Sequence, residues 1–432
     1  MPPVPTLAAP APARRGPATG APLGSGRLLP VAAGATLLVI GFRAGAVPGG
    51  QVGVDLLLAA AGWWFGSGAV AAGAVGPRWS EALHRVWPGA LAALLGATAW
   101  VLVTDDTTRD RVVRGAALGL LGGYGNWHQL SVGPSELGRT HLQSPLAHLW
   151  PWAVAVQAAL AFSVLFWLAR AFGTRRRGRP HPVVLPTLVL AGALLVWSVV
   201  LLVGDASPAH LLLDTRVRGV AFLLGAAVGA AGTSPLGRLL RSAAATAGIV
   251  ALALLAVLAA GGSPRSTLWQ DGGALAAPVL AALAVTLAAP WPARRRSTDE
   301  RAVDGAVDGD PVAAGRLAGS AVEPWNVLVA ALLVHGPVLA LASPARTHLP
   351  WAGARLVGLV LVVLASIAVA GAAGHLGRTE AARERRRVLV PPAFVAVLLL
   401  LLSATGAFHW EHTRPLTPEE IRTRSSQGDG PG

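Results

Sequence analysis

Long apolar stretches alternate with short polar connections along most of the chain. Each is close to the ~17–25 residues that a helix needs to cross a bilayer. None shows the strict apolar–polar alternation of a half-buried strand, so the pattern predicts helices. We therefore expect an all-α integral membrane protein. The twelve segments lie near residues 29–47, 52–74, 87–104, 112–131, 148–169, 183–203, 217–233, 244–262, 272–291, 325–343, 354–374 and 388–408.

Arginine-rich connections set the expected orientation of these segments. They lie at 78–85, 170–179, 294–301 and 378–387, and positive charge gathers in the cytoplasmic loops of multi-pass proteins. Three apolar segments separate the first two connections, although both connections should lie in the cytoplasm. We expect segment 112–131, which carries a glycine-rich break, to be re-entrant. This leaves about 11 transmembrane helices in the plasma (inner) membrane, with the N-terminus cytoplasmic and the C-terminus extracytoplasmic.

The composition agrees with a membrane protein and excludes several functions. Hydrophobic residues form 53% of the chain and charged residues 13%, whereas soluble domains carry about 25% charged residues. The chain has no Cys, so disulfides, thiolate metal sites and a Cys nucleophile are excluded. Scattered His residues favour no metal site. Because the positive charge lies between apolar segments, we expect membrane lipid and no nucleic acid as a partner.

The polar stretches divide the chain into parts. Residues 1–28 are rich in Pro, Ala and Gly, lack a signal-peptide cleavage pattern, and predict a disordered cytoplasmic tail. The main transmembrane domain is expected over 29–383, with a disordered loop at 297–318. Segment 388–408 predicts an extra C-terminal transmembrane helix, and 409–432 a polar extracytoplasmic tail.

Ionisable side chains inside apolar segments are the first candidates for function, because burying one unpaired is costly. Most of them lie near segment ends, where snorkelling or helix capping explains them equally well. His335 differs, since it lies deep within LVAALLVHGPVLALA and should face a polar cavity or another helix. The set comprises Arg43, Asp55, His128, His148, Arg216, Arg218 and His335.

Short motifs add little chemistry. Gly62–Gly66 and Gly225–Gly229 have the GxxxG spacing that suits close helix packing. There is no Walker loop, no H-E-x-x-H, and no G-x-S-x-G in a strand–helix setting. The sequence therefore gives no support to the soluble enzyme classes that these motifs mark.

Several short pieces, taken in chain order, resemble the acyltransferase 3 family of polytopic membrane O-acyltransferases. The stretch 42–62 reads FRAGAVPGGQVGVDLLLAAAG and is similar to that family's Pro-Gly-Gly-Phe-Val-Gly-Val-Asp loop. HRVWPGA at 84–90 is similar to its Arg-Arg-Ile-Leu-Pro-Ala. Further similar pieces are Asn126-Trp127, Ser144-Pro145-Leu146, His148-x-Trp150 leading to Gln157, Asp214-Thr215-Arg216 and His335-Gly336-Pro337.

The resemblance implies acyl transfer to envelope glycans or other extracytoplasmic hydroxyl acceptors, with no bound cofactor and acyl-CoA as the possible donor. However, Ala32 and Arg43 stand where the family has an Arg and a His on its first helix. Ala155 and Val156 stand where it has paired Glu. Loss of a general base typically costs a factor of ~10²–10⁴ in rate, and a guanidinium stays protonated and cannot replace it. Catalysis is therefore expected to be impaired or lost.

Three functions remain open at this point. The chain is an inactive acyltransferase 3-like protein that works by binding, for example to an envelope glycan or a lipid-linked acceptor. Alternatively it is an active, divergent O-acyltransferase with His148 or His335 as the catalytic base. As a third alternative, the expected broken helix suits a transporter or lipid flippase. The candidate substrate-binding residues are Arg43, Asp55, Trp150, Gln157 and Arg216, and the sequence names no protein partner.

Overall fold

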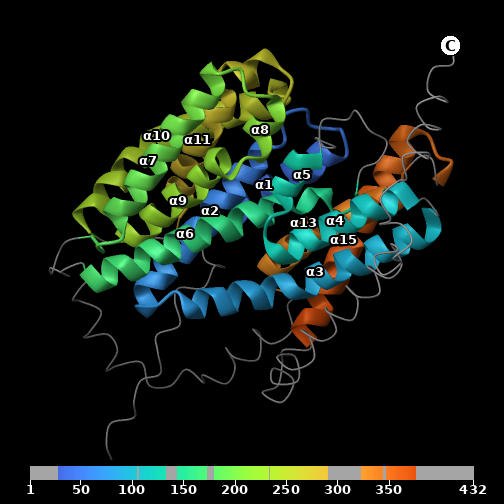
Figure 1. Ribbon diagram of the computed structural model, residues 1–432, viewed down its shortest axis with the longest axis horizontal. Helices are drawn as coiled ribbons and strands as arrows, with labels where there is room; N and C mark the ends of the chain where they lie inside the picture. The colour runs from blue at the N-terminus through green and yellow to red at the C-terminus, as the bar shows by residue number, and fades with distance from the viewer. Residues whose placement is uncertain are drawn as a thin grey trace, which may run out of the picture. The chain divides into compact units, whose positions relative to one another are not determined.

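All regular elements among the residues that the computed structural model describes are helices (Figure 1). These residues are 28–104, 107–132, 144–172, 180–232, 234–289, 323–343 and 347–375, and none of them forms a strand. Eight of the described helices are long and apolar enough to cross a membrane. A multi-pass, membrane-embedded protein follows from this finding.

The expected count of about 11 spans is not confirmed. Two of the expected segments form helices that are short for a span, α1 (Leu28–Arg43, 16 residues) and α9 (Thr215–Ala231, 17 residues). Segment 112–131 is broken, and segment 388–408 lies outside the described residues. The expected tails (1–28 except its last residue, and 409–432) and the loop 297–318 also lie outside them.

The described helices fall into two compact units, and several long helices contribute to both. Unit 1 comprises Met1–Val86 and Val154–Leu332, and unit 2 comprises Trp87–Ala153 and Leu333–Gly432. Unit 1 holds α1, α2 (Val52–Ala72), the start of α3 (Gly76–Thr104), most of α6 (Trp150–Phe172), α7 (Val184–Val203), α8 (Pro208–Leu213), α9, α10 (Pro235–Gly261), η3 (Trp269–Gly273), α11 (Ala274–Ala288) and the start of α13 (Pro324–Leu341).

The core of unit 1 is the crossing of α2 and α9, which the two GxxxG pairs make possible. A Cβ on any of the four glycines would lie only 2.0–2.3 Å from a backbone carbonyl oxygen of the other helix. The two backbones are therefore in direct contact, as small residues allow in membrane helices. The facing residues are Gly62 with Phe222, Gly66 with Ala226, Gly225 with Ala59, and Gly229 with Trp63.

The register of this crossing shows that α2 and α9 run in the same direction. Residue numbers rise together along both helices, from Gly62 opposite Phe222 to Gly66 opposite Ala226. The N-terminal ends of the two helices therefore lie at the same end of unit 1. The contacts of α7 with α9 and of α10 with α11 complete the bundle around them (Figure 1).

Unit 2 contains the broken segment as a tight helical pair. Helix α4 (Thr107–Gly122) ends where Gly123 adopts φ 64°, and α5 (Gly125–Val132) begins two residues later. A Cβ on Gly119 would lie 2.7 Å from Cα of Gly125, and one on Gly115 would lie 2.2 Å from the ring of His128. The chain therefore folds back on itself, as the glycines predict. The unit also holds the rest of α3, η2 (Ala147–Leu149), the start of α6, the end of α13 and α15 (Trp351–His375).

Candidate functional site

The two histidines expected to act in catalysis lie together in unit 2. The ring centroids of His148 and His335 are 4.4 Å apart, with the rings edge to face. Their residues are 4% and 1% exposed, so both imidazoles are withdrawn from the surface. The structure thus brings together η2, which carries His148, and α13, which carries His335.

Pro337 explains where His148 is anchored on α13. A proline inside a helix has no N–H to give to the carbonyl four residues earlier, which here is the carbonyl of Leu333. The Nε2 atom of His148 lies 3.0 Å from this Leu333 oxygen. When Nε2 carries a proton, the imidazole replaces the backbone hydrogen bond that the proline removes.

The second ring nitrogen of His148 also faces a carbonyl oxygen. Nδ1 lies 2.9 Å from the oxygen of Pro145. A carbonyl only accepts, and a neutral imidazole has a single N–H, so both hydrogen bonds exist together only when the ring is protonated. Neither nitrogen of His148 is left facing a substrate hydroxyl in this geometry.

Neighbouring residues hold this arrangement in place. A Cβ on Gly336 would lie 2.0 Å from Nδ1 of His148, so only glycine leaves room for the ring. Gln129 of α5, itself 6% exposed, donates from Nε2 to the carbonyl of Ala147 at 2.6 Å. Trp150, an expected substrate contact, is 5% exposed at the start of α6.

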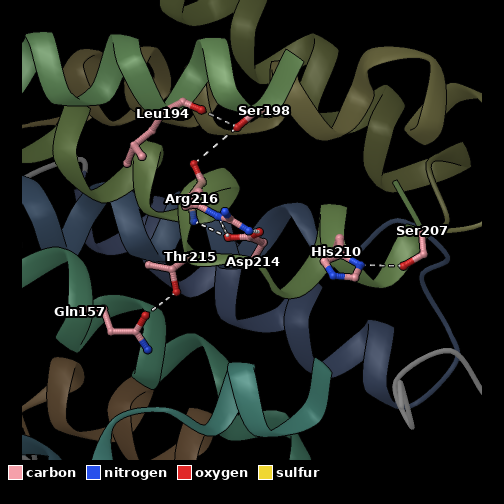
Figure 2. Close-up of polar contacts among 8 residues, drawn as sticks. All are labelled: Gln157, Leu194, Ser198, Ser207, His210, Asp214, Thr215 and Arg216. Carbon is pink, nitrogen blue, oxygen red and sulfur yellow. Dashed lines mark hydrogen bonds and ion pairs between the residues drawn. The ribbon is translucent and has the colours of Figure 1, made fainter. Parts of the chain in front are cut away.

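A second polar network surrounds the N-terminus of α9 in unit 1 (Figure 2). The side chain of Asp214 caps the helix by accepting from the backbone N–H of Arg216 at 2.8 Å. The guanidinium of Arg216 folds back onto the same carboxylate, with Nη2 2.7 Å from Oδ2. Thr215 donates from its hydroxyl to Oε1 of Gln157 on α6 at 2.6 Å.

These contacts give the expected substrate-binding residues Gln157 and Arg216 clear structural partners. Gln157 joins α6 to the first residue of α9. Arg216 is bonded to Asp214, and its guanidinium carbon lies 4.9 Å above the ring of Trp197 on α7. Both residues therefore fix the start of α9 against its neighbours.

The expected site residue Asp55 pairs with Arg218, an ionisable candidate that was not among the expected substrate-binding residues. Arg218 Nη1 donates to Asp55 Oδ2 at 2.7 Å, and both side chains are 0% exposed. Arg218 Nε donates to the carbonyl of Leu212 at 3.1 Å, and its guanidinium lies 4.7 Å from the ring of Trp269 on η3. An ion pair between α2 and α9 is thus completely buried in unit 1.

The signal that could have identified Arg218 is helical periodicity. Residues two positions apart on a helix are rotated by about 200° around its axis. Arg216 and Arg218 therefore lie on different faces of α9. Arg216 is 39% exposed on the outer face, while Arg218 points into the α2 contact at 0%. An arginine on the glycine-lined face of α9 needs a buried acid, and Asp55 in the first turn of α2 supplies it.

The positions where the resemblance expects further catalytic groups carry none of that chemistry. Ala32 is 1% exposed in the apolar face of α1, and its carbonyl accepts from the Thr36 hydroxyl at 2.9 Å. Arg43 is half-buried in the last turn of α1. Ala155 and Val156 are half-buried on α6. The described residues contain no group of three or more His, Asp or Glu that could hold a metal ion.

Comparisons with known proteins place no constraint on this site. No protein-family model, no curated protein and no solved structure matches the chain.

Proposed function

We propose that this chain is a multi-pass membrane protein with an acyltransferase 3-like frame that works by binding and has lost catalysis. Its ligand is an envelope glycan or a lipid-linked molecule on the extracytoplasmic side. The resemblance of its motifs to that family, in order along the chain, supports the frame. The missing basic and acidic groups at Ala32, Ala155 and Val156 support the loss of acyl transfer.

The observation that carries the proposal is the engagement of His148. A general base needs a nitrogen lone pair within hydrogen-bond reach of the acceptor hydroxyl. Here both nitrogens of His148 lie within 3.0 Å of backbone carbonyl oxygens. The residue joins η2 to α13 and is a positioning residue of the fold.

The distribution of arginine supports an orientation for unit 1. Connections 44–51 and 204–214 contain no Arg or Lys, and connection 262–268 contains Arg265 alone. Among the connections at the other ends of these helices, 170–179 and 294–301 contain arginine clusters. By the positive-inside rule, the N-terminus is cytoplasmic, and the N-terminal ends of α2 and α9 face the extracytoplasmic side of the plasma membrane.

A survey of O-linked acyl groups on envelope glycans and lipids tests this function. Mass spectra from a strain that lacks the chain are compared with spectra from the same strain complemented by the wild-type chain. The proposal expects identical acyl profiles. An acyl group that disappears on deletion and returns on complementation would show that the chain transfers it, with acyl-CoA as the first donor to test.

A divergent active enzyme is the second candidate, and one observation favours it. The rings of His148 and His335 are in contact at 4.4 Å, as expected if one imidazole orients or polarises the other. In that case His335 is the base, and His148 positions it.

A further inference from the structure

Four buried polar residues, which we call the cluster, lie at the shared N-terminal end of α2 and α9: Asp55 and Trp269 contact Arg218, and Gln51 is the N-cap of α2. Asp55 Oδ1, Arg218 Nη2, Trp269 Nε1 and Gln51 Oε1 have no hydrogen-bond partner within the described parts of the chain. The four residues are at most 1% exposed. Buried polar groups are normally satisfied, so a cluster of four such atoms requires a partner from outside the described chain.

The geometry of the ion pair creates this requirement. A guanidinium and a carboxylate commonly form two parallel hydrogen bonds. Here Arg218 uses Nη1 for Asp55 and Nε for the carbonyl of Leu212. Arg218 Nη2 therefore remains as a donor, and Asp55 Oδ1 remains as an acceptor. The guanidinium and the carboxylate that carry them are already joined through Nη1 and Oδ2.

The remaining two atoms belong to the side chains of Trp269 and Gln51. Trp269 lies against the guanidinium of Arg218 at 4.7 Å and adds an indole donor. Gln51 lies one helical turn before Asp55, is fixed by its Nε2 to the carbonyl of Gly262, and adds an acceptor. The cluster therefore offers two donor groups and two acceptors.

This combination selects a neutral ligand. An anion would face the Asp55 carboxylate and the Gln51 carbonyl, and a cation would face Arg218. A hydroxyl group both donates and accepts, so it can bridge Asp55 Oδ1 and Arg218 Nη2. The formal charges of the pair cancel, which leaves no net charge for a ligand to neutralise.

The local backbone is also irregular where the cluster meets the α10–α11 connection. Trp269 lies on η3, a π-helical turn that contains Gly272 with φ 141°. The ring of Trp269, the first residue of this turn, lies over the guanidinium of Arg218.

We propose that Asp55, Arg218, Trp269 and Gln51 form a binding site for a neutral polyhydroxylated ligand. One ligand hydroxyl bridges Asp55 Oδ1 and Arg218 Nη2, and a second accepts from Trp269 Nε1. This proposal specifies the ligand chemistry of the binding function proposed above, and it rests on that function. In the proposed orientation it lies at the extracytoplasmic end of unit 1.

Equilibrium dialysis of the purified full-length protein with radiolabelled myo-inositol tests the site, with inorganic phosphate as the anionic probe. Trp269→Phe removes only the indole donor and keeps a ring over Arg218. Trp325→Phe is the matched control, because Trp325 is also buried (8% exposed) with an indole nitrogen that has no partner among the described residues. Arg218→Lys is a second variant, which keeps the positive charge and removes the planar set of guanidinium N–H donors.

The expected result is saturable binding of inositol, with no binding of phosphate. Trp269→Phe should weaken it about three- to tenfold, as for the loss of one neutral hydrogen bond, and Trp325→Phe should leave it unchanged. Arg218→Lys should weaken it further. Absence of saturable inositol binding, which indicates water alone at the cluster, overturns the proposal, as do equal effects of the two Trp variants or preferential binding of phosphate. The acyl survey is a separate readout, so a catalytic result there leaves the dialysis result interpretable.

Discussion

At the residue scale, Gly336 and Pro337 act on His148 in two different ways. Pro337 leaves the Leu333 carbonyl without its helical donor, and His148 Nε2 supplies the missing hydrogen bond at 3.0 Å. Gly336 supplies the space, since a Cβ there would lie 2.0 Å from Nδ1. Gly336 and Pro337 of the His-Gly-Pro triplet are therefore explained by their contacts with His148.

Substituting Gly336 by Ala should displace the His148 ring. Overpacking a tight contact typically costs about 1–3 kcal/mol, so we expect a lower thermal midpoint for the purified protein in detergent. Gly371→Ala on α15 is the control, because a Cβ there has no atom within 4 Å. Equal midpoints for the two variants would show that His148 does not require this space.

A double-mutant cycle between Pro337→Ala and His148→Ala tests the replaced hydrogen bond. Pro337→Ala restores a backbone donor for the Leu333 carbonyl, which then no longer needs the imidazole. We expect the cost of His148→Ala to be smaller in this background, with a coupling of about 0.5–1.5 kcal/mol. Additive free energies of unfolding would contradict the account.

At the element scale, the α2–α9 crossing combines an apolar contact between glycines with a buried pair of charged side chains. Glycine pairs bring the backbones together along most of the contact, and the Asp55–Arg218 pair lies buried at its N-terminal end. Buried ion pairs add little net stability, but removing one partner is costly. We therefore expect the pair to disfavour other registers of the two helices, because any of them would leave a buried charge without its partner.

Asp55→Leu alone should destabilise the protein by about 3–5 kcal/mol, because it leaves the buried Arg218 charge uncompensated. The double variant Asp55→Leu with Arg218→Met should recover most of this loss. Chemical unfolding in mixed micelles measures both. A double variant as unstable as the single one would show that the ion pair contributes more than the cost of an unpaired charge.

Gly225→Val should separate the two helices. A Cβ at this position would lie 2.1 Å from the carbonyl oxygen of Ala59, whereas one on Gly192 of α7 has no atom within 4 Å. We expect Gly225→Val to lose monodisperse protein in size-exclusion chromatography while Gly192→Val behaves as the wild type. Normal behaviour of both variants would contradict direct backbone contact.

At the scale of the whole molecule, the contrast between arginine-poor and arginine-rich connections supports the orientation that we propose for unit 1. The chain has no Cys, so single cysteines can be introduced without a background. We expect Ala46→Cys, exposed between α1 and α2, to react with a membrane-impermeant maleimide in intact cells. Ala74→Cys, exposed between α2 and α3, should react only after permeabilisation. The reverse pattern would invert the proposed topology.

Much of the architecture could be predicted from local sequence, while the side-chain pairings could not. Apolar length predicted the helices, and Gly122, Gly123 and Gly125 predicted the break between α4 and α5, because these signals act within a few residues. The count of spans was not confirmed, partly because α1 and α9 are short. The pairing of Asp55 with Arg218 depends on a contact between residues 163 positions apart, which no local pattern specifies.

The most direct test of lost catalysis is the acyl survey extended to histidine variants. O-linked acyl groups are quantified by mass spectrometry in the deletion strain complemented with the wild type, His148→Ala or His335→Ala at equal protein levels. The account predicts the same acyl profile in all of these strains and in the uncomplemented deletion strain. An acyl group restored by the wild type, but not by one of the His variants, would contradict it and identify an active acyltransferase.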